Sequence, residues 1–164
     1  MKRRRLPSPR ASDPARPILR ILDANFNRAL EGCRVVEDVL RLGGPRNGTA
    51  ARGPSPVSGV RHVDLKVLRH RISFLRSKFG LRRLVGARDV ESDPGAFLAD
   101  AQEKRYPSYH ALLAANLQRL KESLRVIEEV GRTLPARRLF EDAKRLRFQA
   151  YALEEKIISA TKKR

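Results

Sequence analysis

Residues 23–41 read DANFNRALEGCRVVEDVLR, and this stretch decides the fold because a close copy of it occurs later in the chain. It aligns without a gap on AANLQRLKESLRVIEEVGR, residues 114–132, with identical residues at nine of nineteen positions. A weaker match relates the segment that begins at Asp64 to the segment that begins at Asp142. Self-similarity of this kind indicates a repeated supersecondary unit. We therefore expect a duplicated helix pair with a pseudo-twofold axis, and a loop insert over residues 81–108 between the halves.

Apolar residues recur at steps of three and four in four segments, which is the spacing of one face of an α-helix. The four stripes are Leu22, Phe26, Ala29, Cys33, Val36 and Leu40; Leu65, Leu68, Ile72, Leu75 and Phe79; Leu113, Leu117, Leu120, Leu124 and Ile127; and Leu139, Ala143, Leu146, Ala150, Leu153 and Ile157. Amphipathic helices of this length bury such stripes most simply against one another. The predicted fold is therefore an all-α helical bundle.

The chain has 164 residues, of which 41% are hydrophobic and only 5% aromatic. This length suits one domain with its own core, which we place at residues 18–160. Residues 1–17 are basic and rich in proline, so they predict a disordered arm. Glycine and proline over residues 43–60 predict a flexible linker inside the domain, and residues 161–164 form a basic tail.

The net charge of +18 raises the question of a nucleic-acid partner. Segments 1–20, 42–61 and 161–164 carry twelve of these charges, so most of the excess lies outside the periodic segments. A duplex-binding protein more often concentrates its cations along one helix face. We therefore treat nucleic acid as an unlikely partner.

No apolar run reaches the roughly 18 residues of a membrane-spanning helix, and no apolar region follows the basic N-terminus. We expect a cytoplasmic protein without a membrane partner. Cys33 is the only cysteine, which excludes an internal disulfide.

The two copies share a polar signature of Asn, Arg, Glu, Arg and Glu at three-residue intervals. Its members are Asn25, Arg28, Glu31, Arg34 and Glu37 in the first copy, and Asn116, Arg119, Glu122, Arg125 and Glu128 in the second. One interpretation is a surface ladder of alternating charge, each pair worth about 0.2–0.5 kcal/mol. The repeated asparagine argues against it, because Asn is a poor helix former and brings no charge. The alternative is a polar cleft between the halves, since the Asn and the last Glu fall at the edges of the apolar stripe.

The insert contains LVGARDVESDPG, which groups Arg88, Asp89 and Asp93. This segment is either an ordinary turn with Asp93 as a helix cap, or a loop whose two aspartates bind Mg²⁺ while Arg88 holds a phosphate. His70 is a weaker candidate, because a lone helical histidine is more often structural. The sequence has no Walker loop, G-x-G-x-x-G, H-E-x-x-H or G-x-S-x-G motif, so anion binding must rely on arginine side chains and helix N-termini.

Five segments carry a family resemblance: ILDANFNRALEGCRVVEDVLR, DLKVLRHRI, ARDVESDPG, AANLQRLKESLRVIEEVGR and LFEDAKRLRFQAYALEEKI. In this order they resemble the small, all-helical, monofunctional hydroxymethylpyrimidine-phosphate kinase domain of thiamine biosynthesis, which is often fused ahead of thiamine-phosphate synthase. The resemblance covers about residues 18–160. It departs from the family pattern at Cys33, Ala96 and Val130, where the family commonly has Leu, Thr and an aromatic residue.

The resemblance implies ATP-dependent phosphorylation of 4-amino-2-methyl-5-(phosphomethyl)pyrimidine to the diphosphate, which the synthase joins to the thiazole phosphate. Our leading hypothesis is therefore a phosphomethylpyrimidine kinase that uses ATP and Mg²⁺, with the pyrimidine phosphate and a nucleotide as its ligands. One alternative is a non-catalytic companion that binds the pyrimidine phosphate for thiamine-phosphate synthase. A second alternative is a basic helical nucleic-acid-binding module.

Phosphoryl transfer depends mainly on positioned cations, so the arginines of the signature are the first candidates for the chemistry. The catalytic candidates are Arg28, Arg119, Arg34, Arg125, Glu31 and Glu122. The substrate-binding candidates are Asn25, Asn116, Glu37, Glu128, Arg69, His70, Arg88 and Arg147. The candidates for binding Mg²⁺ are Asp89 and Asp93.

Overall fold

The computed structural model describes residues 13–42, 62–91, 93, 105–135 and 137–161. Over these residues the regular elements are five helices and no strand: α1 (Arg16–Leu42), α2 (His62–Ser77), α3 (Leu81–Gly86), α4 (Tyr109–Gly131) and α5 (Arg137–Thr161). The predicted all-α bundle is confirmed. That its two helix pairs are a duplication stays a prediction.

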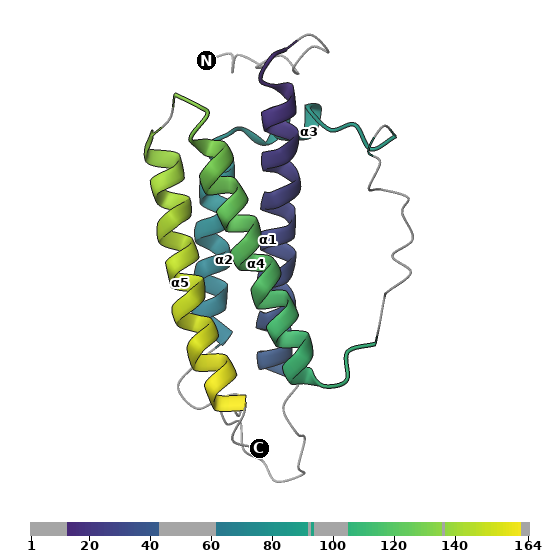
Figure 1. The fold of residues 1–164 in the computed structure, drawn as a ribbon, viewed down its shortest axis with the longest axis vertical. Helices are drawn as coiled ribbons and strands as arrows, with labels where there is room; N and C mark the ends of the chain where they lie inside the picture. The colour runs from purple at the N-terminus through teal and green to yellow at the C-terminus, as the bar shows by residue number, and fades with distance from the viewer. Residues whose placement is uncertain (1–12, 43–61, 92, 94–104, 136, 162–164) are drawn as a thin grey trace, which may run out of the picture.

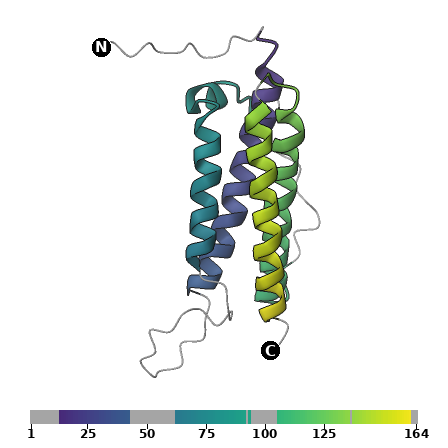
Figure 2. The same cartoon turned by 90° about the vertical axis from the view of Figure 1, so that its left-hand side faces the viewer.

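The four long helices run along one axis (Figure 1). Helix α1 packs on α2 and α4, and α5 packs on α4 and α2, so each long helix has two long neighbours, and α1 also contacts the short helix α3. Figure 2 shows α2 on one side of the bundle, α4 and α5 on the other, and α1 between them. Helices α1 and α4 run in opposite directions, so the two copies of the polar signature meet head to tail.

The four predicted stripes form the core. In α1 the stripe residues Leu22, Phe26, Ala29, Cys33 and Val36 are fully buried, and the Phe26 ring lies 5.5 Å from the ring of Phe79. The stripes of α2 and α4 are buried along their whole length. In α5 the stripe residues Leu139 and Leu153 are partly buried and pack against this core. The three- and four-residue spacing therefore predicted the buried face of every long helix.

The ends of the helices differ from the predictions in two places. Helix α1 begins at Arg16, so the last two residues of the predicted arm belong to the helix. Just before the helix, the Asp13 carboxylate accepts a hydrogen bond from the backbone N–H of Ala15 at 2.9 Å. The predicted loop insert begins with the short helix α3. Gly80 separates α2 from α3 with a φ of 78°, a conformation that a residue with a Cβ rarely adopts.

Several predictions lie outside the described residues. They concern most of the arm, the linker over residues 43–60, the tail beyond residue 161, and the departure at Ala96.

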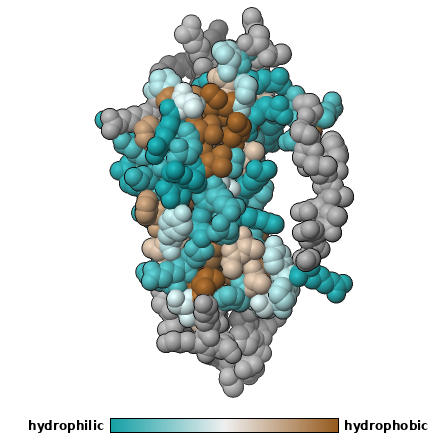
Figure 3. Space-filling view, in the orientation of Figure 1, coloured by the Kyte–Doolittle hydropathy of each residue, from teal (hydrophilic) through white to brown (hydrophobic). Residues whose placement is uncertain are grey.

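The face of the molecule shown in Figure 3 is mostly hydrophilic, with a hydrophobic area toward its upper end. No helix within the described segments is long and apolar enough to cross a lipid bilayer.

Candidate functional site

A cavity of about 570 Å³, which we call the α1–α4 cleft, lies between these two helices. Its lining consists of five pairs of residues, each separated by 91 positions: Asn25 and Asn116, Arg28 and Arg119, Glu31 and Glu122, Gly32 and Ser123, Val35 and Val126. Six of these ten residues belong to the repeated polar signature. The structure thus brings the first half of both signatures to one site.

A close approach of the two helices fixes the shape of the cleft. A Cβ at Gly32 would lie 2.8 Å from the backbone oxygen of Asn116, so only glycine allows this spacing. Because Gly32 faces Asn116 and the helices run in opposite directions, Asn25 lies seven residues away along α1. At 1.5 Å per residue this is about 10 Å, so the two asparagines mark opposite ends of the cleft.

Both asparagines are buried, at 6% exposure for Asn25 and 4% for Asn116. The amide nitrogen of Asn25 donates to the backbone oxygen of Ile21 at 2.8 Å, and that of Asn116 donates to Leu112 at 2.9 Å. Each amide group is therefore held by its own helix through its nitrogen. The amide oxygen remains as the acceptor that each residue offers to the cleft.

The arginines of the cleft differ from the other arginines among the predicted site residues. Within the described residues, neither Arg28 nor Arg119 pairs with a carboxylate, and both are exposed. The others pair with carboxylates: Arg34, Arg69, Arg88, Arg125 and Arg147. Arg28 and Arg119 thus keep their donors available for an anion in the cleft.

The second half of each signature ties neighbouring helices together. Glu37 of α1 accepts a hydrogen bond from Arg69 of α2 at 2.8 Å, and this bond raises the pKa of Arg69. Glu128 of α4 accepts from Arg147 of α5 at 2.8 and 3.0 Å. Burial alone would raise the pKa of Glu128, but Arg147 and the nearby Arg125 outweigh it, so the pKa lies below its ordinary value.

These ion pairs place six predicted site residues away from the cleft. These six residues do not line the cleft: Arg34, Arg69, Arg125, Arg147, Glu37 and Glu128. Glu37 and Glu128 do lie at the edge of the apolar stripe, as predicted, and they are 3% and 0% exposed.

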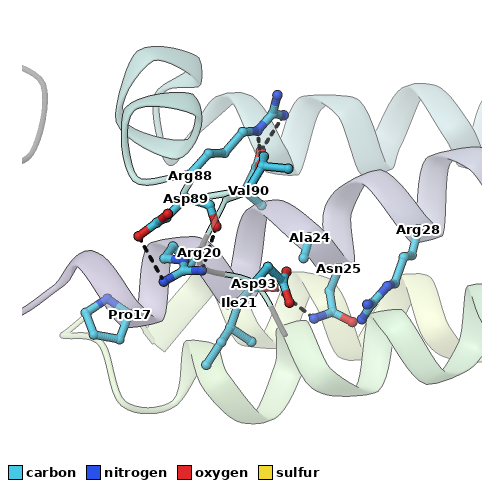
Figure 4. Close-up of a pocket in the computed structure, with 11 residues that line it drawn as sticks. Pro17, Arg20, Ile21, Ala24, Asn25, Arg28, Arg88, Asp89, Val90 and Asp93 are labelled. Atoms are coloured by element: carbon cyan, nitrogen blue, oxygen red, sulfur yellow. Dashed lines mark hydrogen bonds and ion pairs between the residues drawn. The ribbon is translucent and has the colours of Figure 1, made fainter. Parts of the chain in front are cut away.

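A second cavity, of about 540 Å³, adjoins the cleft, and we call it the side cavity. It shares Asn25 and Arg28 with the cleft, and its remaining walls come from the first turns of α1 and from the segment that follows α3 (Figure 4). Those walls are formed by Pro17, Arg20, Ile21, Asp23, Ala24, Arg88, Asp89, Val90 and Asp93.

Asp23 anchors the side cavity. Its carboxylate is 4% exposed and accepts hydrogen bonds from the guanidinium of Arg88 and, at 3.2 Å, from Arg76 of α2. The hydrogen bond to Asp23 raises the pKa of Arg88. Next to this pair, Arg20 donates to the backbone oxygen of Asp89 at 3.0 Å, so contacts at both Arg88 and Asp89 fix the segment after α3 to α1.

The predicted metal ligands Asp89 and Asp93 both line the side cavity. The Asp89 carboxylate lies 3.8 Å from Arg16 and 3.9 Å from Arg20, so a cation there would compete with two guanidinium groups. The described residues contain no group of three or more His, Cys, Asp or Glu placed to hold a metal ion. Mg²⁺ at this pair of aspartates stays a prediction, as does ATP. His70 is exposed on α2 and lines neither cavity.

Sequence reasoning missed Asp23 and Ser123. Ser123, which aligns with Gly32 in the two copies, lines the cleft. Asp23 is aligned with Ala114, and a charge present in only one copy could have marked it as a residue with a separate role.

Comparison with known proteins identifies the family. The family model described as "ThiD2 family" matches residues 20–156. The chain belongs to the ThiD2 family. It is also 39% identical over 136 residues to a thiamine-phosphate synthase of Thermosynechococcus vestitus, a match that covers 83% of this chain and 34% of the relative. No solved structure matches the chain.

Two further thiamine-phosphate synthases show the same partial coverage. The protein of a Nostoc species is 35% identical over 86% of this chain and 35% of its own length. The protein of Rhodopirellula baltica is 30% identical over 84% of this chain and 33% of its own length. The chain therefore spans about a third of the length of the curated relatives it matches.

These comparisons confirm the predicted link of the ThiD2 chain to thiamine biosynthesis, but they contradict the predicted phosphomethylpyrimidine kinase. The relatives bear the name of a different enzyme, thiamine-phosphate synthase. The resemblance in the five segments thus indicated the right pathway and the wrong reaction.

Proposed function

We propose that the chain is a non-catalytic helical unit that binds the pyrimidine phosphate of thiamine biosynthesis in the α1–α4 cleft and delivers it to a thiamine-phosphate synthase. Membership in the ThiD2 family and similarity to synthases support this role. The chain corresponds to only a third of those relatives, so their remaining two thirds leave ample room for the synthase reaction itself.

The observation that carries the proposal is that Arg28 and Arg119 line the cleft without a carboxylate partner among the described residues. Arginine binds phosphate through parallel N–H donors, and a pair of such residues around one cavity suits a dianionic phosphate. Glu31 and Glu122 line the same cavity and limit its net charge, which favours a ligand with both an anionic and a hydrogen-bonding part.

The remaining polar groups suit an aminopyrimidine ring. The amide oxygens of Asn25 and Asn116 are acceptors for an exocyclic amino group. The hydroxyl of Ser123 can donate to a ring nitrogen. The cavity of about 570 Å³ lies within the range of about 300–1,000 Å³ that is usual for small-molecule sites.

The test is a calorimetric titration with 4-amino-2-methyl-5-(phosphomethyl)pyrimidine. The double variant Arg28→Gln/Arg119→Gln should bind it at least about tenfold more weakly, because hydrogen bonds to charged groups contribute about 1.5–3 kcal/mol each. The matched control is Arg82→Gln/Lys144→Gln, which removes two exposed charges that line neither cavity. Equal affinities of the two double variants would contradict the proposal.

A second measurement addresses the companion role. Adding the chain to a thiamine-phosphate synthase at a low concentration of pyrimidine substrate should raise the rate of thiamine phosphate formation. The chain alone, mixed with ATP, Mg²⁺ and the pyrimidine monophosphate, should form no diphosphate. Formation of the diphosphate in that mixture would contradict a non-catalytic role.

A further inference from the structure

The hydroxyl of Ser123 is buried in the wall of the α1–α4 cleft without a hydrogen-bond partner among the described residues. Ser123 lies within α4, lines the cleft and is 4% exposed. A serine in a helix can donate to the backbone oxygen four residues before it, but Ser123 makes no such bond. Alanine is the better helix former and brings no polar group to bury. A buried serine at this position therefore indicates a hydrogen-bond partner from outside the chain.

The facing wall of the cleft cannot supply an equivalent group. The position of α1 that aligns with Ser123 is Gly32, and a Cβ there would lie 2.8 Å from the backbone oxygen of Asn116. No side chain, and hence no hydroxyl, fits at that position. Ser123 is thus the one difference in residue type between two walls that otherwise each contribute an Asn, an Arg, a Glu and a Val.

Ser123 lies nearer to the end of the cleft that contains Asn25. Gly32 meets α4 within the turn that follows Asn116, and α1 and α4 run in opposite directions. Asn25 stands seven residues before Gly32, so it lies level with residues 123–127 of α4. Asn116 stands seven residues before Ser123 on the same helix, a separation of about 10 Å. The Asn25 end therefore has an amide acceptor and a hydroxyl donor, whereas the Asn116 end has the amide acceptor and no hydroxyl.

We propose that Ser123 is a specificity-determining residue that sets the direction of the pyrimidine phosphate in the cleft. The amino group of the ligand is a donor and the ring nitrogen beside it is an acceptor, so this edge of the ring matches the Asn25 amide oxygen and the Ser123 hydroxyl. The phosphate lies toward the middle of the cleft, where Arg28 and Arg119 share it, because both arginines stand between the two asparagines. This inference rests on the proposed function and adds to it the direction of the ligand and the residue that selects that direction.

Calorimetric titrations of Ser123→Ala with two ligands test the hydrogen bond. The first ligand is 4-amino-2-methyl-5-(phosphomethyl)pyrimidine, and the second is its analogue in which CH replaces the ring nitrogen next to the amino group. Ser123→Ala should bind the pyrimidine about threefold to tenfold more weakly, the loss expected for one hydrogen bond. Its affinity for the analogue should change less than about twofold, because the analogue offers the hydroxyl no acceptor. The control is Ser73→Ala, which replaces an exposed serine that lines neither cavity and should change neither affinity.

A comparison of Asn25→Ala with Asn116→Ala tests the direction of the ligand. Asn25→Ala should weaken binding of the pyrimidine about threefold or more, and Asn116→Ala less than about twofold. Both asparagines are buried and donate to their own helix in the same way, so a merely structural effect would be alike in the two variants. Thermal unfolding checks that each variant is folded, and where alanine prevents folding, leucine restores most of the lost volume.

Three outcomes would overturn the inference. Unchanged binding of the pyrimidine by Ser123→Ala would show that the hydroxyl does not contact it. Equal losses for the pyrimidine and the analogue would show that Ser123 only shapes the cleft. Equal effects of the two asparagine variants, or a larger effect of Asn116→Ala, would show that the ring is not held at the Asn25 end. The proposed function fails separately, when Arg28→Gln/Arg119→Gln binds the pyrimidine as tightly as the unchanged chain does.

Discussion

Glu128→Gln tests whether the buried ion pair between α4 and α5 holds the bundle together. Glu128 is fully buried, and its carboxylate accepts hydrogen bonds from Arg147 at 2.8 and 3.0 Å and from Arg125 and Arg132 at 3.0 Å each. Glutamine keeps the volume of the side chain but removes the charge that faces three guanidinium groups. The Arg147 side chain is only 11% exposed, so water cannot replace the lost partner.

The expected loss follows from this geometry. Removing one member of a buried ion pair costs about 3–5 kcal/mol. Arg125 and Arg132 are about half exposed and recover part of their hydration, so we expect the lower end, about 3 kcal/mol. For a chain of this size, each kcal/mol lowers the melting temperature by about 2–4 °C, which gives a decrease of about 6–12 °C.

The assay is thermal unfolding followed by circular dichroism at pH 7, with Glu129→Gln as the control. Glu129 is the next residue, is 43% exposed, and pairs with the same Arg125 and Arg132. Because exposed pairs contribute about 0–1 kcal/mol, its replacement should lower the melting temperature by less than about 4 °C. If Glu128→Gln shifted the melting temperature no more than Glu129→Gln does, the reasoning about burial would be refuted.

Three further predictions concern acid, packing and the thiol. The pKa values of Glu128 and Asp142 are lowered in the folded chain, so these carboxylates stabilise the fold above their ordinary pKa values of 4.5 and 3.8. This stabilisation is lost as the pH falls through the pKa values of the folded chain. The melting temperature should therefore fall in an acid titration, and Glu128→Gln should make this fall smaller. Gly32→Ala should lower the free energy of unfolding by about 1–2 kcal/mol in chemical denaturation, because the alanine Cβ would clash with the backbone of Asn116. A more stable variant would mean that α1 and α4 separate easily at this point. Burial, and to a smaller extent the charge of Glu37, raises the pKa of the Cys33 thiol to about 12. A thiol reagent at pH 8 should therefore modify only the unfolded chain. Rapid modification of the folded chain would contradict the buried position of Cys33.

The core of the fold was predictable because helical spacing is a local property of the sequence. Leu22, Leu68, Leu117 and Leu146 lie on stripes whose period does not depend on what the helix packs against, and all four are buried. Helix α3 was not predicted, because six residues are too few to show a period.

The site was predictable only in part. The repeated Asn was expected at a shared polar cleft, because a polar residue kept in both copies at the edge of the stripe indicates a shared environment, and both asparagines line one cavity with Arg28 and Arg119. Their roles stay predictions. The partner of each arginine was not predictable, since it depends on which helices are neighbours. Arg69 and Arg147 carry the same charge as Arg28, yet their positions on α2 and α5 bring them to Glu37 and Glu128 instead of the cleft.

A crystal structure of the chain with 4-amino-2-methyl-5-(phosphomethyl)pyrimidine tests the central claim most directly. Our account predicts the ligand in the α1–α4 cleft, with its phosphate within hydrogen-bonding distance of Arg28 and Arg119 and its ring within reach of an asparagine amide. A ligand bound elsewhere on the bundle, with Arg28, Arg119 and both asparagines untouched, would contradict the account.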